Sequence, residues 1–226
     1  MKKIIIAFFI VFYTSTCFGG GYPLIELGGG VSISVPSPPG FRPLGKASED
    51  FRLYSQSRLL PGSVLLEVFL TDKDFRDVLS GYSGSRVREL QIWDPAQVLG
   101  EHYDVTKFNQ AVVDMRAMTD VSGNIDSAIR EFLSSGVDSF SRTSPKKGNI
   151  EFRGKFMDEP RAVGILSCSV IAKPDGRQKY CVAQVVLHVR DRVVTLTIGS
   201  QIRGSADVDW VKSISLSWVD QIINAN

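Results

Sequence analysis

The chain contains 226 residues, of which 43% are hydrophobic and 22% are charged. This apolar content is enough to bury a core in one domain or in two small lobes. Its 26 basic residues nearly balance its 24 acidic residues, whereas a nucleic-acid-binding protein is expected to carry excess positive charge on one face. The composition therefore argues against nucleic acid as a partner.

The N-terminus has the three parts of a secretory signal peptide. Lys2 and Lys3 precede an unbroken apolar run from Ile4 to Tyr13, and small and polar residues, TSTCFGGG, follow it. A run of 10 residues is well short of the roughly 20 that a permanent transmembrane helix needs. We therefore predict a signal peptide over residues 1–19, a periplasmic or secreted protein, and no stable transmembrane helix. Loss of the two lysines leaves 24 basic against 24 acidic residues, a formal charge of zero.

Cys17, near the end of this signal, leaves two forms of the exported protein open. Lipoprotein processing prefers an aliphatic residue three places before the cysteine and Gly, Ala or Ser just before it, but these places hold Thr14 and Thr16. The sequence therefore favours cleavage near residues 17–19 and a soluble product. A membrane-anchored lipoprotein, with its lipid anchor at Cys17, is the alternative.

The remaining chain is predicted to form one domain behind a short leader. Clustered glycines flank the segment over residues 20–30, and glycine clusters behave as a coil, which predicts a flexible leader. Residues 31–226 are predicted to form a single α/β domain. The polar segment over residues 141–149 marks an internal division of that domain.

The first half of the domain is predicted to consist mainly of strands. Alternation of valine and isoleucine with serine indicates a half-buried strand, and a nearly continuous apolar run indicates a central one. Pro61-Gly62 provides a short turn between two apolar runs. The predicted elements are strands over 31–35, 51–60, 64–70 and 87–93, and a polar loop over 72–85.

The second half is predicted to mix helices and strands. Asp104 is a good N-cap, and Val105, Phe108, Val112 and Met115 follow it at helical spacing. The other predicted elements are a helix starting at Asn124 or Asp126, a one-sided strand carrying Ile150, Phe152 and Phe156, a hairpin of 182–189 with 193–198 around Asp191, and a final amphipathic helix from about Asp207.

Two cysteines lie at the ends of one apparent hairpin, CSVIAKPDGRQKYC over residues 168–181. The central Lys173-Pro174-Asp175-Gly176 combines three turn-favouring residues. A two-residue turn places Cys168 and Cys181 directly opposite each other, whereas a glycine bulge shifts them by one residue. We predict a disulfide in the exported protein, worth about 3 kcal/mol on a chain-entropy model. Two buried, unpaired cysteines are the alternative for a cytosolic protein.

The order of elements resembles that of the PsbP-like superfamily. The resemblance is carried by VSISVPSPPGFRPL (31–44) and by the closing hairpin and helix, VVLHVRDRVVTLTIGSQIRGSADVDWVKSISLSWVDQII (185–223), and it covers most of residues 31–224. It implies an α+β fold, a mostly antiparallel sheet flanked by helices as an α/β/α sandwich and closed by an amphipathic C-terminal helix. It also implies a non-enzymatic accessory or binding role, and it assigns no site residues.

Residues with catalytic chemistry are few. His102 lies in a predicted loop, and His188 lies mid-strand on the same face as Gln184. GYSGS at 81–85 ends in serine, unlike a nucleophile elbow, and lies in a polar loop. No HExxH, CxxC or calcium-loop motif occurs in the sequence, so we predict no metal site, no cofactor and no catalytic residues. Trp93, His102 and Tyr103 form the candidate surface site.

These observations favour an exported, non-enzymatic module that binds another protein. That partner would be an envelope complex, which it serves as an accessory subunit, or a delivered toxin, which it neutralises as an immunity protein. The alternative is a periplasmic small-ligand binder or a hydrolase that uses a histidine.

Overall fold

The computed structural model describes residues 22–81, 87–117, 150–173 and 176–226. Their elements, in chain order, are β1 (Leu24–Glu26), β2 (Ser32–Ser34), β3 (Phe41–Pro43), α1 (Glu49–Gln56), β4 (Ser63–Thr71), α2 (Asp72–Leu79), β5 (Arg88–Pro95), α3 (Val105–Ala111), α4 (Val113–Ala117), β6 (Ile150–Glu159), β7 (Ala162–Lys173), β8 (Gly176–Val189), β9 (Arg192–Ile202) and α6 (Ser205–Asn224).

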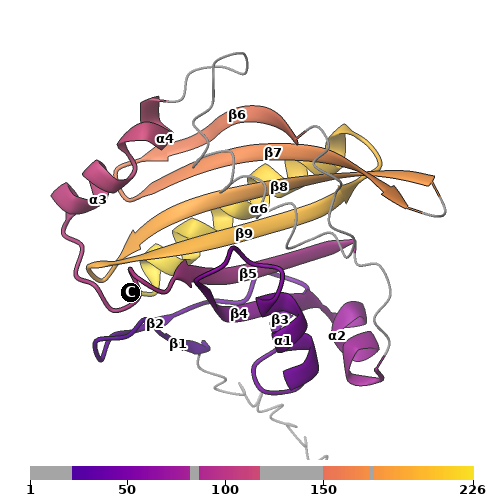
Figure 1. Cartoon of the computed structure of the whole chain (residues 1–226), viewed down its shortest axis with the longest axis horizontal. Coiled ribbons are helices and arrows are strands. Elements are labelled where there is room, and N and C mark those ends of the chain that lie inside the picture. The colour runs from indigo at the N-terminus through magenta and orange to yellow at the C-terminus, as the bar shows by residue number, and fades with distance from the viewer. Residues whose placement is uncertain (1–21, 82–86, 118–149, 174–175) are drawn as a thin grey trace, which may run out of the picture.

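A seven-stranded sheet in the order β3-β4-β5-β9-β8-β7-β6 forms the centre of the molecule, and all its neighbouring strands are antiparallel. Helix α6 lies behind the sheet in Figure 1, and β1 and β2 form a separate two-stranded sheet. The shorter helices pack on the opposite face, α1 and α2 over β4 and β5, and α3 and α4 over β6 and β7. This arrangement confirms the predicted α+β fold with helices on both sides of an antiparallel sheet.

The face under α6 is apolar and contains the largest core cluster. Trp218 of α6 packs edge-on against Phe69 of β4, with ring centroids 5.2 Å apart. Its indole Nε1 donates to the Pro36 carbonyl at 2.8 Å, so the one polar atom of the ring is satisfied in the core. Alternate residues of the central strands supply the rest of this apolar face, including Leu90, Ile92, Leu166, Cys168, Cys181, Ala183, Val185, Leu196 and Ile198.

Two segments predicted as strand or loop are helices. In the segment predicted as a strand over residues 51–60, Ser48 caps α1 by accepting from the Phe51 N–H at 3.3 Å. In the predicted loop, Thr71 caps α2 by accepting from the Asp74 N–H at 3.1 Å, while its hydroxyl donates to the Asp74 carboxylate. Both helices begin with a capping residue followed by acidic residues, which favour the positive end of a helix dipole.

The predicted flexible leader is also wrong, because residues 22–30 are part of the fold. Strand β1 pairs with β2, and Ile25 and Leu27 are buried in the α6-side core. Gly28 adopts a φ of 79°, and a Cβ there would come within 2.9 Å of the Gly100 Cα. Glycine is therefore needed at this position for both the turn and the close packing of the two loops.

The strand predicted around residues 150–156 forms, but not as a one-sided strand. Its pairing with β7 shifts register between Phe152 and Gly154, where Gly154 has a φ of 99°, and again between Lys155 and Met157. Phe152 consequently packs under α3 and α4, whereas Phe156 packs against the α6-side core. A bulge moves the following side chains to the other face, which the alternation of residue types alone does not reveal.

Other predictions are confirmed. The β8–β9 hairpin closes through Arg190 and Asp191, both at positive φ, with Val189 opposite Arg192. Asp104 caps α3, and α6 buries Val211, Trp218 and Ile222. The second predicted helix, from Asn124 or Asp126, and the predicted division over 141–149 lie outside the described residues, as do most of GYSGS and the signal peptide.

Candidate functional site: a stapled hairpin arm and its surroundings

Strands β7 and β8 extend beyond their neighbours as a two-stranded projection. Strand β9 pairs with β8 only as far as Ile202, which lies opposite Lys179, and Lys179 in turn lies opposite Val170 of β7. On the other side, β6 pairs with β7 only as far as Ser169. Beyond these positions, β7 and β8 pair only with each other among the described residues. We call the segments 170–173 and 176–179 the arm, which points away from the sheet at the right of Figure 1.

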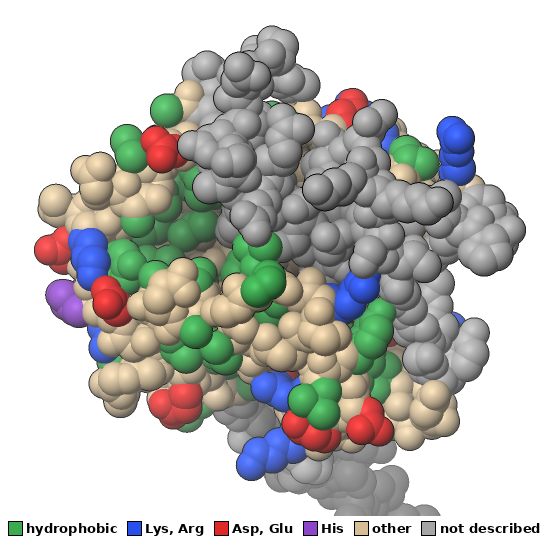
Figure 2. Space-filling model, viewed as in Figure 1, with side chains coloured by type: hydrophobic (Ala, Val, Ile, Leu, Met, Phe, Trp, Pro, Cys, Tyr) green, Lys and Arg blue, Asp and Glu red, His purple; other side chains and the backbone are tan. Residues whose placement is uncertain are grey.

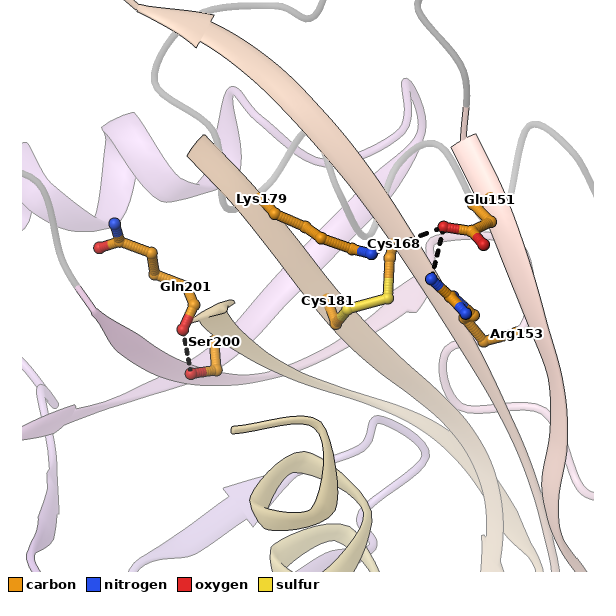
Figure 3. The surroundings of a disulfide bond; sticks show 7 residues. All are labelled: Glu151, Arg153, Cys168, Lys179, Cys181, Ser200 and Gln201. Atoms are coloured by element: carbon orange, nitrogen blue, oxygen red, sulfur yellow. Dashed lines mark hydrogen bonds and ion pairs between the residues drawn. A yellow bond between two sulfur atoms is a disulfide. The ribbon is translucent and has the colours of Figure 1, made fainter. Parts of the chain in front are cut away.

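The Cys168–Cys181 disulfide joins the two strands at the base of the arm (Figure 3). The two cysteines are directly opposite in the register, with Cα atoms 4.0 Å apart. This pairing corresponds to the two-residue turn and confirms the predicted bridge. Both cysteines are fully buried on the apolar face, at 1% and 0% exposure.

An ion-pair network lies beside the disulfide. Glu151 of β6 accepts from Arg153 at 2.7 Å and lies 3.6 Å from the Lys179 ammonium of β8 (Figure 3). All three side chains are between a third and a half exposed, so water and salt screen the pairs. The disulfide and the sheet, rather than these charges, hold the base of the arm.

A cation–aromatic stack lies at the same end of the sheet. The Arg88 guanidinium lies 4.0 Å from the centre of the Trp210 ring, and Phe41 stacks on Trp210 with centroids 6.1 Å apart. Arg88 also pairs with Asp207 at 3.4 Å. Arg88 is opposite Ser200 of β9, two residues before the Ile202 that borders the arm. Partly exposed tryptophan and arginine are typical of protein–protein contact centres.

Asp207 fixes the start of α6 beneath this stack. Its carboxylate accepts from the backbone N–H groups of Arg203 at 2.9 Å and Gly204 at 3.3 Å. The hydrogen bond from the Arg203 N–H, with smaller contributions from Gly204 and Arg88, lowers the pKa of Asp207 from its ordinary value. The carboxylate therefore stays ionised and orients both the helix and the Arg88 side chain.

The face of the sheet opposite α6 carries a second group of candidate residues, a row of buried polar side chains that we call the polar face. Gln91, Thr197 and Gln184 are neighbours in register across β5, β9 and β8. The Gln91 amide donates to Glu89 at 2.6 Å, and the Trp93 indole donates to Thr197 at 2.8 Å. The polar face consists of Glu89, Gln91, Ser167, Ser169, Gln184, Thr195 and Thr197.

Charges on this side of the molecule are mixed in sign. Figure 2 shows the described basic and acidic side chains interspersed over the surface rather than gathered into one patch. The view agrees with the balanced composition of the chain.

The candidate surface residues do not share one exposed site. His102 is exposed, but Tyr103 is buried with Lys107 lying 4.2 Å over its ring, and Trp93 is buried in the cluster under α1. His188 is buried as well, with its Nε2 2.7 Å from the Tyr103 carbonyl and its ring tilted against Phe108. Trp93 and Tyr103 are large and buried, and their role is packing.

The described residues, 22–81, 87–117, 150–173 and 176–226, show neither a metal-binding cluster nor a membrane-spanning helix. In that part of the chain, no group of three or more His, Cys, Asp or Glu side chains is placed to hold a metal ion. Among the helices in the same ranges, none combines the length and the apolar character that crossing a bilayer requires.

Comparison with known proteins gives no family assignment. No protein-family model matches the chain, and no curated protein matches it. Among solved structures, the chain is similar to the crystal structure of LpqN, which is involved in cell envelope biogenesis of Mycobacterium tuberculosis. The two share 11% sequence identity with a TM-score of 0.27, over 86% of this chain and 80% of LpqN. A likeness this weak carries no conclusion about fold or function to this chain.

Proposed function

We propose that this protein is an exported, non-enzymatic module that binds another protein through the arm and the adjoining Arg88–Trp210–Phe41 stack. The observation that carries the proposal is the disulfide at the base of a hairpin that extends beyond the sheet. A covalent link at this point fixes the register of the two strands at the base of the arm and restricts its conformations before it meets a partner. Binding then loses less conformational entropy than it would with a flexible loop.

The arm has the chemistry for main-chain recognition. A strand without a neighbour presents unpaired N–H and C=O groups, and extended segments of other proteins bind to such edges. Val170, on the arm, is 51% exposed, which is unusual for a strand valine and adds an apolar contact. The nearby stack supplies the aromatic and arginine side chains that dominate many interfaces.

Export is part of the same proposal. The charged start, short apolar run and small residues at the N-terminus support a signal peptide. Disulfides persist in oxidising compartments and are rare in the cytosol, so the bridge supports a periplasmic or secreted location. Cleavage near residues 17–19 gives the form proposed here, and lipidation at Cys17 would anchor the same domain to a membrane.

Two kinds of partner fit an exported binding module. One is an envelope complex that the protein serves as an accessory subunit, the role implied by the PsbP-like resemblance. The other is a toxin that the protein neutralises. A histidine-dependent hydrolase has less support, because the Nε2 atom of His188 is already engaged with the Tyr103 carbonyl in a buried position.

Affinity capture from the native envelope fraction tests the proposal, with residues 20–226 as bait. We expect one protein to be recovered near one-to-one stoichiometry. The identity of that protein decides between an accessory and an immunity role. Recovery of nothing above background, from bait with an intact disulfide, would contradict protein binding and favour the small-ligand alternative, which His102→Ala and His188→Ala variants would then test.

A further inference from the structure

One edge of the main sheet is closed by side chains instead of by a strand. The edge strand β3 pairs only with residues 69–71 of β4. From Ser63 to Glu67, no strand pairs with that side of β4 among the described residues. An open edge of this length is a template for pairing with another chain.

Gln56, the last residue of α1, occupies the middle of this edge. Its side-chain carbonyl accepts from the Leu65 N–H at 2.6 Å, and its amide nitrogen donates to the Ser63 carbonyl at 2.6 Å. The two bonds flank Val64, which is how the N–H and C=O of one residue in a neighbouring parallel strand would bond to β4. The side-chain amide therefore takes the place of the main-chain N–H and C=O of one residue.

Arg52, one turn earlier on α1, covers the next part of the edge. Its guanidinium donates to the carbonyls of Leu65 at 3.4 Å and Leu66 at 3.5 Å. It also lies 3.8 Å from Glu67, whose carboxylate accepts from the N–H groups of Gly45 and Val68 at 3.0 and 2.9 Å. Side chains thus satisfy the outward main-chain groups along this stretch of β4.

The small sheet is closed in the same way. The Asn226 side chain accepts from the Ser34 N–H at 2.9 Å and donates to the Ser34 carbonyl at 2.8 Å, so an amide again bonds both main-chain groups of an edge strand. At the opposite edge of the main sheet, β6 carries two register shifts and several charges, which also discourage pairing.

We infer that Arg52 and Gln56 are gatekeepers that keep the β4 edge from pairing with the β4 edge of a second copy of this chain. Two identical edges are self-complementary when they meet antiparallel about a two-fold axis, because a residue that bonds a given residue of the other strand is matched by the reciprocal bond on the other side of the axis. Without the two side chains, the Leu65 N–H and the carbonyls of Ser63, Leu65 and Leu66 lose these partners. A second copy always offers the matching groups.

The experiment compares the self-association of the wild-type protein with that of Gln56→Ala and Arg52→Ala/Gln56→Ala by sedimentation velocity over a concentration series. We expect a monomeric wild type and a self-association constant raised about tenfold or more in the double variant, since one pairing hydrogen bond is worth roughly that factor. Hydrogen exchange gives the second readout: the Leu65 amide should lose protection in the dilute variant and regain it as concentration rises.

Leu53→Ala is the matched control, because Leu53 lies on the same helix and is 59% exposed. It should remain monomeric. A folded double variant that stays monomeric throughout the series would overturn the inference. If the double variant does not fold, Gln56→Ala alone provides the test, since it removes both bonds to Ser63 and Leu65 and leaves Arg52 in place. A folded Gln56→Ala that stays monomeric with unchanged Leu65 exchange would likewise contradict the gatekeeper role.

Discussion

The two faces of the main sheet are built from the same strands but differ in what they bury. On β7, Leu166 faces α6 within a continuous apolar cluster, and the next residue, Ser167, faces the polar side. Both are about equally buried, yet the Ser167 hydroxyl has no hydrogen-bond partner. Burial at these two neighbouring positions therefore has opposite energetic consequences: it stabilises the fold at Leu166, whereas at Ser167 it removes a hydroxyl from water without compensation.

The largest expected effect concerns a buried carboxyl group. Asp94 of β5 lies opposite Val64 of β4 and is only 1% exposed. Burial raises the pKa of Asp94 from 3.8 to about 8, opposed by smaller effects of the Thr195 backbone N–H and hydroxyl. The folded protein therefore holds a proton that the unfolded chain has already released between about pH 4 and pH 8.

Because of this difference, stability should fall as pH rises through that window and level off above the folded-state pKa. The loss from Asp94 over the whole window is on the order of 5 kcal/mol. Asp94→Asn should remove this part of the pH dependence. The stability of the variant relative to the wild type should therefore be higher at pH 8 than at pH 5. Urea unfolding of both proteins at the two pH values measures it. Parallel pH profiles would show that Asp94 is not buried as described.

A truncation under α6 should have the next largest effect. Leu166→Ala removes part of a fully buried side chain from the apolar face and should destabilise the protein by about 2–5 kcal/mol, through lost burial and the cavity left behind. Chemical unfolding gives the difference directly. A change below about 1 kcal/mol would mean that this face is less tightly packed than the structure indicates.

The disulfide contributes a comparable amount at the base of the arm. Replacing both Cys168 and Cys181 by alanine should lower the free energy of unfolding by about 3 kcal/mol, because the sequence separation of 13 residues defines the loop whose closure is lost. Since both sulfur atoms are buried, the native bridge should resist a reductant that acts readily after denaturation. Two titratable thiols in freshly exported, denatured but unreduced protein would disprove the bridge.

The smallest effect is expected beside Leu166, at Ser167. Ser167→Ala removes a buried hydroxyl that has no partner, and the variant should be within about 0.5 kcal/mol of wild type or slightly more stable. A loss of more than 1 kcal/mol, roughly that of a lost hydrogen bond, would show that this hydroxyl is bonded after all and would weaken the contrast between the faces.

Local signals in the sequence were sufficient for some features and not for others. The cysteine hairpin and the final helix follow from short-range turn and periodicity patterns, and the structure confirms both. The strand predicted over residues 51–60 is wrong, because the apolar content of this segment outweighs the capping signal of Ser48 that marks the start of α1. The polar face depends on the pairing of β5 with β9, whose residues are about a hundred positions apart, so no local pattern could place Gln91 beside Thr197.

The candidate site shows the same division. The position of Cys168 opposite Cys181 could be derived from the turn between them. The Arg88–Trp210–Phe41 stack joins three distant segments, and the bonds from Gln56 to β4 depend on a helix that was predicted as a strand. Conversely, residue type alone predicts a surface site at Trp93 and Tyr103, but the register of β5 and the loop before α3 bury both side chains.

The most direct test of the central claim is parallel capture from the native envelope fraction with wild-type residues 20–226 and with a variant in which residues 171–178 are replaced by Asn-Gly. This replacement removes the arm beyond Val170 and Lys179 but keeps the disulfide and a two-residue turn, and circular dichroism and thiol titration verify its fold. We predict one partner near one-to-one with the wild type and its loss with the shortened arm. Equal recovery with both baits, or no partner with either, would contradict an arm-based binding function.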